Sequence, residues 1–148
     1  MKKSTSNILF LLSIGFCLIH SQTAIAQMKK EYLAANNAQM EALGVFMAAG
    51  HKGQASLTDD EARLAMTKLE AVKKLNLAYL DLIYDSGNTR CKQSIDEFKK
   101  SGLTKFDAFL QAGPSKLKNV GESMSAMMNF NEAFGEIAME TCQDEIMR

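Results

Sequence analysis

Residues 58–88 read TDDEARLAMTKLEAVKKLNLAYLDLIYDSGN, and this stretch decides the fold class. Thr58 and Glu61 form the pattern of a capping box, in which the two residues satisfy each other's free backbone donors at a helix start. Gly87 occupies a position where helices commonly end. Between them, apolar residues recur at intervals of three and four, which is the spacing of one helix face. The residues of this face are Ala65, Leu69, Val72, Leu75, Tyr79 and Leu82 or Ile83. The stretch predicts one long amphipathic helix.

The same helical periodicity continues on both sides of this stretch. A helix is predicted over residues 29–49, ending at Gly50. Its apolar positions are Leu33, Met40, Leu43 and Met47, with Ala35, Ala42 and Phe46 beside them. A third helix carries Cys91, Ile95 and Phe98 and is broken or kinked near Gly102. A fourth starts at Pro114, where the fixed proline φ suits a first turn, and continues to about residue 141. Its apolar positions are Leu117, Val120, Met124, Met127, Asn131, Phe134, Ala138 and Thr141.

No alternating strand pattern appears between these helices, and Pro114 is the only proline. Four amphipathic helices joined by short turns favour an all-α, antiparallel four-helix bundle.

The first 26 residues have the three parts of a secretory signal peptide. Lys2 and Lys3 supply the positive start, an apolar run covers residues 8–19, and Ala24 and Ala26 frame a cleavage site. Twelve apolar residues are fewer than the roughly 20 that span a bilayer, so an uncleaved anchor is the weaker interpretation. We expect residues 1–26 to be removed and residues 27–148 to form a single domain. The protein is then exported, to the periplasm in a bacterium and otherwise by secretion.

The mature chain carries little net charge. Fifteen basic residues stand against seventeen acidic ones once Lys2 and Lys3 are removed. Nucleic-acid binders usually show a basic stripe or patch, so nucleic acid is not expected as a partner. A second apolar run of membrane length is absent, and no membrane association is expected after cleavage.

Two cysteines, Cys91 and Cys142, remain in the mature chain. In an oxidising compartment the simplest expectation is that they pair as a disulfide. Counting along the third and fourth helices from the turn at Gly113 leaves the two cysteines about 9 Å out of register at 1.5 Å per residue. An extended break near Gly102 would recover part of that difference.

Catalytic or cofactor patterns are weak in this sequence. His51 is the only histidine of the mature chain, and we expect it in an exposed loop. The Glu-x-x-His pairs of di-iron bundles and the Cys-x-x-Cys-His motif of covalent haem are absent. We therefore expect no enzyme, no cofactor and no resident metal.

Methionines and asparagines leave two questions open. Met40, Met47, Met124, Met127 and Met128 are expected to fill the core, and copper binding by their thioethers is the alternative. Asn36, Asn37, Asn76 and Asn131 either set helix register from buried positions or line a ligand cleft.

The most informative polar pattern is an acidic ladder in the fourth helix. Glu132, Glu136, Glu140 and Asp144 recur every four residues. Like charges at this spacing cost a helix about 0.2–0.5 kcal/mol per pair, so something should offset them. Pairing with Lys92, Lys99 or Lys73 of neighbouring helices is one explanation, and a docking face for a basic partner is another. A cation site fits less well, because one straight helix does not wrap an ion.

These patterns together predict an exported, non-enzymatic helical bundle that binds another protein, as an inhibitor, an immunity-type protein or an envelope adaptor. The alternative is a bundle that binds a small molecule or a metal. A homodimer is compatible with either function.

Overall fold

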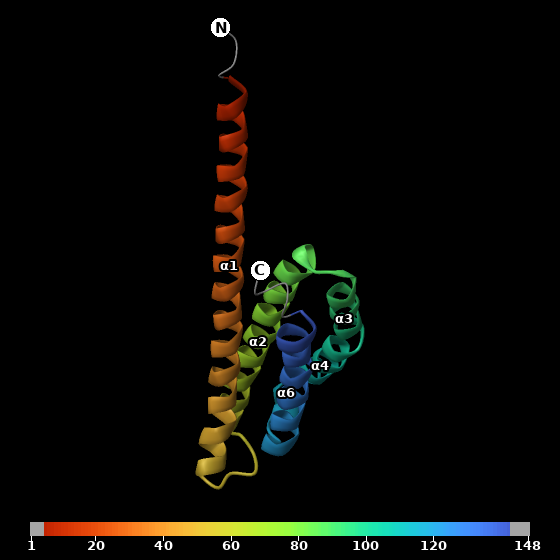
Figure 1. Ribbon diagram of the computed structural model, residues 1–148. Coiled ribbons are helices and arrows are strands. Elements are labelled where there is room, and N and C mark those ends of the chain that lie inside the picture. Colours follow the sequence, from red (N-terminus) through yellow and green to blue (C-terminus); the bar gives the residue numbers. More distant parts are fainter. Residues whose placement is uncertain (1–4, 143–148) are drawn as a thin grey trace.

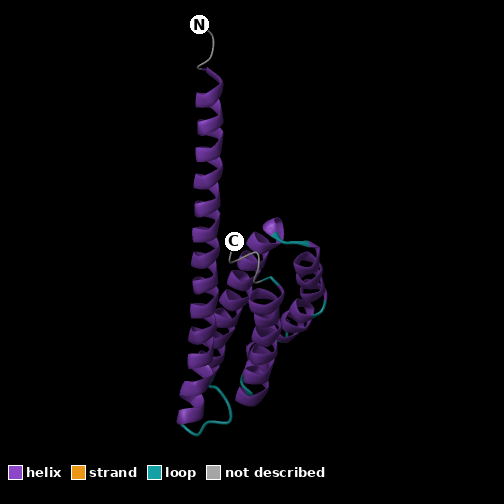
Figure 2. Cartoon of the chain, viewed as in Figure 1, coloured by secondary structure: helices purple, strands orange, loops and turns teal. Residues whose placement is uncertain are grey.

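The computed structural model describes residues 5–142, with side chains described from residue 26 onward. Helices account for nearly all of this range (Figure 2), and no strand occurs within it. The elements are α1 (Thr5–His51), α2 (Asp59–Ser86), α3 (Thr89–Lys100), α4 (Gly102–Gln111), α5 (Pro114–Leu117), α6 (Val120–Gly135) and the π-helix η1 (Glu136–Thr141). Figure 1 shows four columns: α1, α2, α3 with α4, and α6 with η1. The predicted antiparallel four-helix bundle is confirmed.

The helix predicted from residues 58–88 is α2, and its start follows the predicted capping box. The Thr58 backbone N–H donates to Glu61 Oε2 at 2.9 Å, and the Glu61 N–H donates to Thr58 Oγ1 at 3.3 Å. The Thr58 N–H and Oγ1 both donate to Glu61 Oε2, and Lys52 Nζ lies 3.0 Å from Glu61 Oε1; these contacts lower the pKa of Glu61 from 4.5 to about 2. Gly87 follows the end of α2. Its φ of −70° is not left-handed, so backbone conformation is not what requires glycine at this position. A Cβ there would lie 2.9 Å from the Ile83 carbonyl oxygen and 3.0 Å from Cys91 Sγ.

Helix α1 is continuous through the predicted signal segment, and its first half projects beyond the other helices (Figure 1). The prediction for its buried face was wrong for the large residues and right for Ala35, Ala42 and Phe46. Leu33, Met40 and Met47 are exposed, and Leu43 is only partly buried. The core face consists of Met28, Phe46 and the alanines Ala35, Ala38, Ala42 and Ala49. Alanine has almost no side-chain volume, so α1 packs closely along α2 through this face.

The third predicted helix is interrupted at Ser101, between α3 and α4, as expected near Gly102. Ser101 keeps a right-handed helical backbone, with φ −114° and ψ −60°. The Ser101 N–H and Oγ both donate to the Glu97 carbonyl oxygen, at 2.9 and 2.8 Å. The interruption is therefore a kink with little extension, and it does not correct the cysteine register.

The fourth predicted helix was expected to be continuous, but it is interrupted. This interruption corrects the register of the two cysteines. A four-residue helix, α5, is followed by Asn119, whose side chain accepts from the Glu122 N–H at 3.1 Å and caps α6. The break is held by the loop after α1, because the Leu57 N–H donates to the Lys118 carbonyl oxygen at 2.8 Å.

Because α6 starts only at Val120, the length of chain from that start to Cys142 is about the same as the length from Cys91 to the end of α4. The two cysteines therefore lie level with each other. The two cysteines form the predicted disulfide, with a Cα–Cα distance of 5.1 Å.

A small polar group lies inside the bundle. Asn76 is fully buried, and its Oδ1 accepts from Gln39 Nε2 at 3.3 Å. The neighbouring residue on the same face, Tyr79, packs between Tyr32 and Phe134, with ring centroids 5.4 and 5.8 Å away. Its hydroxyl has no hydrogen-bond partner among the described residues, and burial raises its pKa.

Asn76 thus occupies the buried position that the sequence suggested. Asn131 is partly buried, and its Oδ1 has no hydrogen-bond partner in the described chain. Asn36 and Asn37 are exposed instead, so the expectation of a buried or cleft position was wrong for those two.

The methionines divide in a similar way. Met127 is buried and Met124 is partly buried against the core. Met40, Met47 and Met128 are exposed, which contradicts the prediction that they fill the core.

Candidate functional site

The acidic ladder spans the end of α6 and the whole of η1. Glu132 lies in α6, Glu136 and Glu140 lie in η1, and all three are exposed. Asp144 lies outside the described residues. The seven ion pairs within residues 26–142 involve none of these three glutamates. Three like charges therefore stand on this column without a compensating cation in the described chain.

The lysines expected to neutralise the ladder pair elsewhere, so that explanation was wrong. Lys73 Nζ lies 2.5 Å from Asp107 Oδ1, and Lys99 Nζ lies 2.7 Å from Asp81 Oδ1. Lys92 and Lys99 also lie over the Tyr84 ring, 5.6 and 5.5 Å from its centroid. Both α3 lysines thus contact Tyr84 of α2 and, within the described chain, form no ion pair with the glutamates of α6 and η1.

A groove follows the seam between the kinked α3–α4 column and α6. It consists of two adjoining hollows of about 470 and 220 Å³, which share Ser101, Gly102 and Ala133 as lining residues. The larger hollow lies beside α4 and the smaller one reaches η1. Because Glu136 lines the smaller hollow, the groove and the acidic ladder form one continuous surface. We call this surface the acidic groove.

The floor of the acidic groove is aromatic. Phe130 of α6 stacks on Phe106 with ring centroids 4.2 Å apart and meets Phe98 at 5.3 Å. Gly102 makes this packing possible, since a Cβ there would lie 2.9 Å from the Phe98 ring. On the α6 side the lining residues Ala126 and Ala133 are small, which leaves the seam open. The kink and the small residues together make a concave surface with an apolar base.

Charge is distributed unevenly along this groove. Glu97 and Glu136 line the end near the disulfide, and Lys105 lines the opposite end. All three side chains are exposed and have no ion-pair partner among the described residues. The groove is therefore suited to a ligand that combines an apolar group with a cation beside it. The ladder was predictable from its four-residue spacing, but the sequence reasoning missed the groove.

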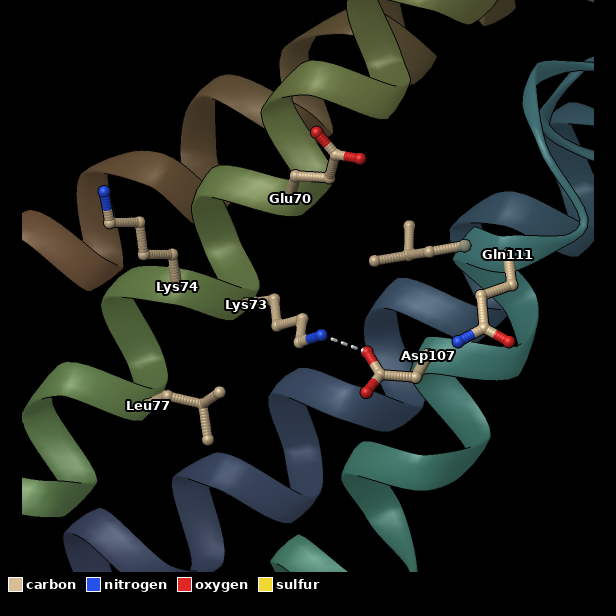
Figure 3. Close-up of a pocket in the computed structure, with 7 residues that line it drawn as sticks. Glu70, Lys73, Lys74, Leu77, Asp107 and Gln111 are labelled. Carbon is tan, nitrogen blue, oxygen red and sulfur yellow. Dashed lines mark ion pairs between the residues drawn. The ribbon is translucent and has the colours of Figure 1, made fainter.

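A second hollow, of about 510 Å³, lies between α2 and α4, and four charged side chains line it together with Leu77, Leu110 and Gln111. Figure 3 shows Lys73 reaching across it to Asp107, while Lys74 points away from that pair. Glu70 supplies a second carboxylate. Its lysines and carboxylates balance in number, and the central pair is already satisfied within the chain. This hollow is a weaker candidate than the acidic groove.

The remaining candidates from the sequence are His51 and a metal site. His51 is exposed, as expected, but it is the last residue of α1 and not part of a loop. Within residues 26–142, no three His, Cys, Asp or Glu side chains lie close enough together to hold a metal ion.

Comparison with known proteins adds no functional information. No family model matches the chain, and neither the curated proteins nor the solved structures contain a match. Over the part of the chain that the structure describes, no helix has both the length and the apolar character needed to cross a membrane.

Proposed function

We propose that this chain is exported and acts without catalysis, by binding another protein through the acidic groove. The partner presents an apolar side chain flanked by lysine or arginine, as an inhibitor target, a toxin or an envelope component could. The signal-like first 26 residues support export. The charge pattern and the shape of the groove support the binding role.

The observation that carries the proposal is the uncompensated charge of Glu132, Glu136 and Glu140. Each like-charged pair four residues apart costs a helix about 0.2–0.5 kcal/mol. The chain forms seven ion pairs elsewhere, yet none within the described residues involves these three side chains. A basic partner would offset this cost and would be attracted over a distance of about 8 Å at physiological salt.

The aromatic floor supplies the second part of the interface. Binding energy in protein interfaces is concentrated in a few apolar or aromatic side chains buried in pockets, whereas charges at the rim mainly set association rate and specificity. The stacked Phe106 and Phe130 lie in the larger hollow, next to the shared residues Gly102 and Ala133. A partner's apolar side chain placed there would bring a flanking cation to Glu97 and Glu136.

The test begins with the exported product of the full-length precursor, captured from periplasmic extract or culture supernatant and analysed with its bound proteins. A partner found in this way is purified, and its dissociation constant is measured against variants. Glu97→Lys with Glu136→Lys, at the two carboxylates that line the groove, should weaken binding at least tenfold. Glu70→Lys with Asp85→Lys makes the same change of charge at exposed sites on α2 and should leave binding within twofold of the wild type.

Equal weakening by both double variants would show that only net charge matters and would contradict a site at the groove. Unchanged affinity for the Glu97/Glu136 variant, with its helical circular dichroism intact, would contradict the proposal altogether.

A small molecule in the same groove is the second candidate, and the aromatic floor is the observation that favours it. The larger hollow has a volume of about 470 Å³, within the roughly 300–1,000 Å³ of small-ligand sites. Native mass spectrometry of the exported product distinguishes the two functions. A co-purified small molecule without a protein partner would favour this candidate over the first.

A further inference from the structure

Helix α1 presents a row of large apolar side chains to solvent. Leu33, Met40 and Met47 lie seven residues apart, so they fall on one side of the helix. Their exposed fractions are 58%, 62% and 47%. The core face of α1 uses other residues, so the fold of this chain alone does not account for the row.

The row continues onto the neighbouring column. The Tyr32 hydroxyl donates to Met139 Sδ at 3.4 Å, which places η1 beside the first mature turns of α1. Met139 and Met128 are themselves 52% and 59% exposed. Five of the six exposed large apolar side chains in the described range thus belong to α1 and the α6–η1 column, and the sixth is Leu64 on α2. We call Leu33, Met40, Met47, Met128 and Met139 the methionine face.

A glycine lies within the α1 row. Gly44 comes four residues after Met40 and three before Met47, which places it on the same side of the helix. A Cβ built on Gly44 would meet nothing within 4 Å. Glycine in a helix interior costs about 1 kcal/mol relative to alanine, and no contact within the described chain requires it here. A helix outside the chain could approach closely at this point.

Charges at one end of the methionine face identify the occupant. Lys29 lies one turn before Leu33, Glu140 follows Met139, and both are exposed without an ion pair in the described chain. A two-fold axis parallel to the helices would lay α1 of one chain on α6 of a second copy. Lys29 would then face Glu140 of the partner subunit, and the reciprocal contact would form by symmetry.

The size of the face is sufficient for such a dimer. Residues 27–50 of α1 extend about 36 Å at 1.5 Å per residue, and the neighbouring helix axis lies roughly 10 Å away. A face about 20 Å wide would bury roughly 700 Å² per chain, close to the roughly 800 Å² per partner of a standard interface. We propose that the methionine face binds a second copy of this chain in a two-fold dimer with two symmetry-related Lys29–Glu140 contacts at the same end of the dimer.

The first experiment compares apolar positions by sedimentation equilibrium of the exported, disulfide-bonded product. The wild type should be a dimer at micromolar concentration. Met40→Glu should raise the dimer dissociation constant at least tenfold. Leu64→Glu, the matched change at the exposed apolar residue outside the face, should raise it less than twofold. Both substitutions are at exposed sites, so circular dichroism should show the helix content and melting temperature of the wild type.

The second experiment tests the arrangement by charge exchange. Lys29→Glu and Glu140→Lys each place like charges at both symmetry-related contacts, so each variant alone should dimerise at least tenfold more weakly. An equimolar mixture should form a heterodimer with near wild-type affinity, because opposite charges then meet at both contacts. Purified chain alone is used, so these results do not depend on the partner of the acidic groove.

A wild-type monomer at all concentrations would overturn the proposal. So would equal effects of Met40→Glu and Leu64→Glu, or a mixture that associates no better than its components. Binding of the monomer to phosphatidylglycerol vesicles through Met40 would assign the face to a lipid surface and would also overturn it.

Discussion

Removal of the Cys91–Cys142 disulfide is the perturbation whose magnitude follows most directly from the structure. The bridge joins the first turn of α3 to the residue after η1, across a sequence separation of 51 residues. Both cysteines are fully buried. In the chain-entropy model, a cross-link closing a loop of this size stabilises the folded state by about 4 kcal/mol. Domains of this size have unfolding free energies of about 5–15 kcal/mol, so the bridge supplies a large fraction of the total.

The change is Cys91→Ala with Cys142→Ala, followed by urea unfolding monitored by circular dichroism. With a denaturant slope near 2 kcal/mol per molar, a loss of about 4 kcal/mol lowers the midpoint by about 2 M. Wild-type protein in reductant should show a similar shift, whereas the double variant should not respond to reductant.

A midpoint within about 0.5 M of the wild type would refute the reasoning, because it would show that the loop is already closed by other contacts in the unfolded ensemble. A shift in the double variant without a shift on reduction would instead assign the loss to packing of the alanines.

Three further predictions concern single sites. Gly102→Ala should lower the unfolding free energy by about 1–3 kcal/mol, because its Cβ would lie 2.9 Å from the Phe98 ring. Gly135→Ala, with open space at its Cβ, should raise the unfolding free energy by about 0.5–1 kcal/mol. Urea unfolding of both variants checks this contrast, and shifts of the same sign in the two variants would contradict the prediction. Because the pKa of Glu61 is lowered from 4.5 to about 2, the stability that its ionised carboxylate contributes is complete above pH 4.5 and is lost as pH falls towards 2. Glu61→Gln keeps a side chain able to cap, so its melting temperature should fall less than that of the wild type between these pH values. An equal fall in both proteins would show that Glu61 is not the source of the pH dependence. Tyr79→Phe removes a buried hydroxyl that has no hydrogen-bond partner within residues 26–142, so the unfolding free energy should stay equal or rise by up to about 1 kcal/mol. A loss above about 1 kcal/mol in calorimetry would indicate a bond through an ordered water.

Local signals in the sequence were sufficient for α2 and for the kink near Gly102. The capping pair Thr58 and Glu61 acts within one turn, so no tertiary contact was needed to place the helix start. The same type of signal was present at Asn119, followed three residues later by Glu122, and it marks the start of α6. The apolar spacing nevertheless runs unbroken from Leu117 to Val120 and favours a continuous helix, so spacing alone does not reveal this start.

The buried face of α1 could not be chosen from apolar spacing alone. Two rows compete there, one of large residues such as Met40 and Met47 and one of alanines such as Ala38 and Ala42. Burial of larger side chains normally gives more hydrophobic free energy, about 25 cal/mol per Å². The structure places the alanines inside, where α1 packs on α2. That outcome depends on interhelical distance, which belongs to the assembled bundle and to no single helix.

The acidic groove illustrates the same division between local and tertiary properties. Its carboxylates recur every four residues, but each such step advances about 40° around an α-helix, so a longer ladder would wind off its starting face. Glu136 and Glu140 lie instead in η1, where i→i+5 bonding takes more residues per turn and opposes that drift. The disulfide at Cys142 anchors this segment to α3, whose Glu97 and Phe98 line the other side of the groove. The sequence spacing therefore supplies the charges, while the π-turn and the disulfide determine that the charges lie beside an aromatic floor.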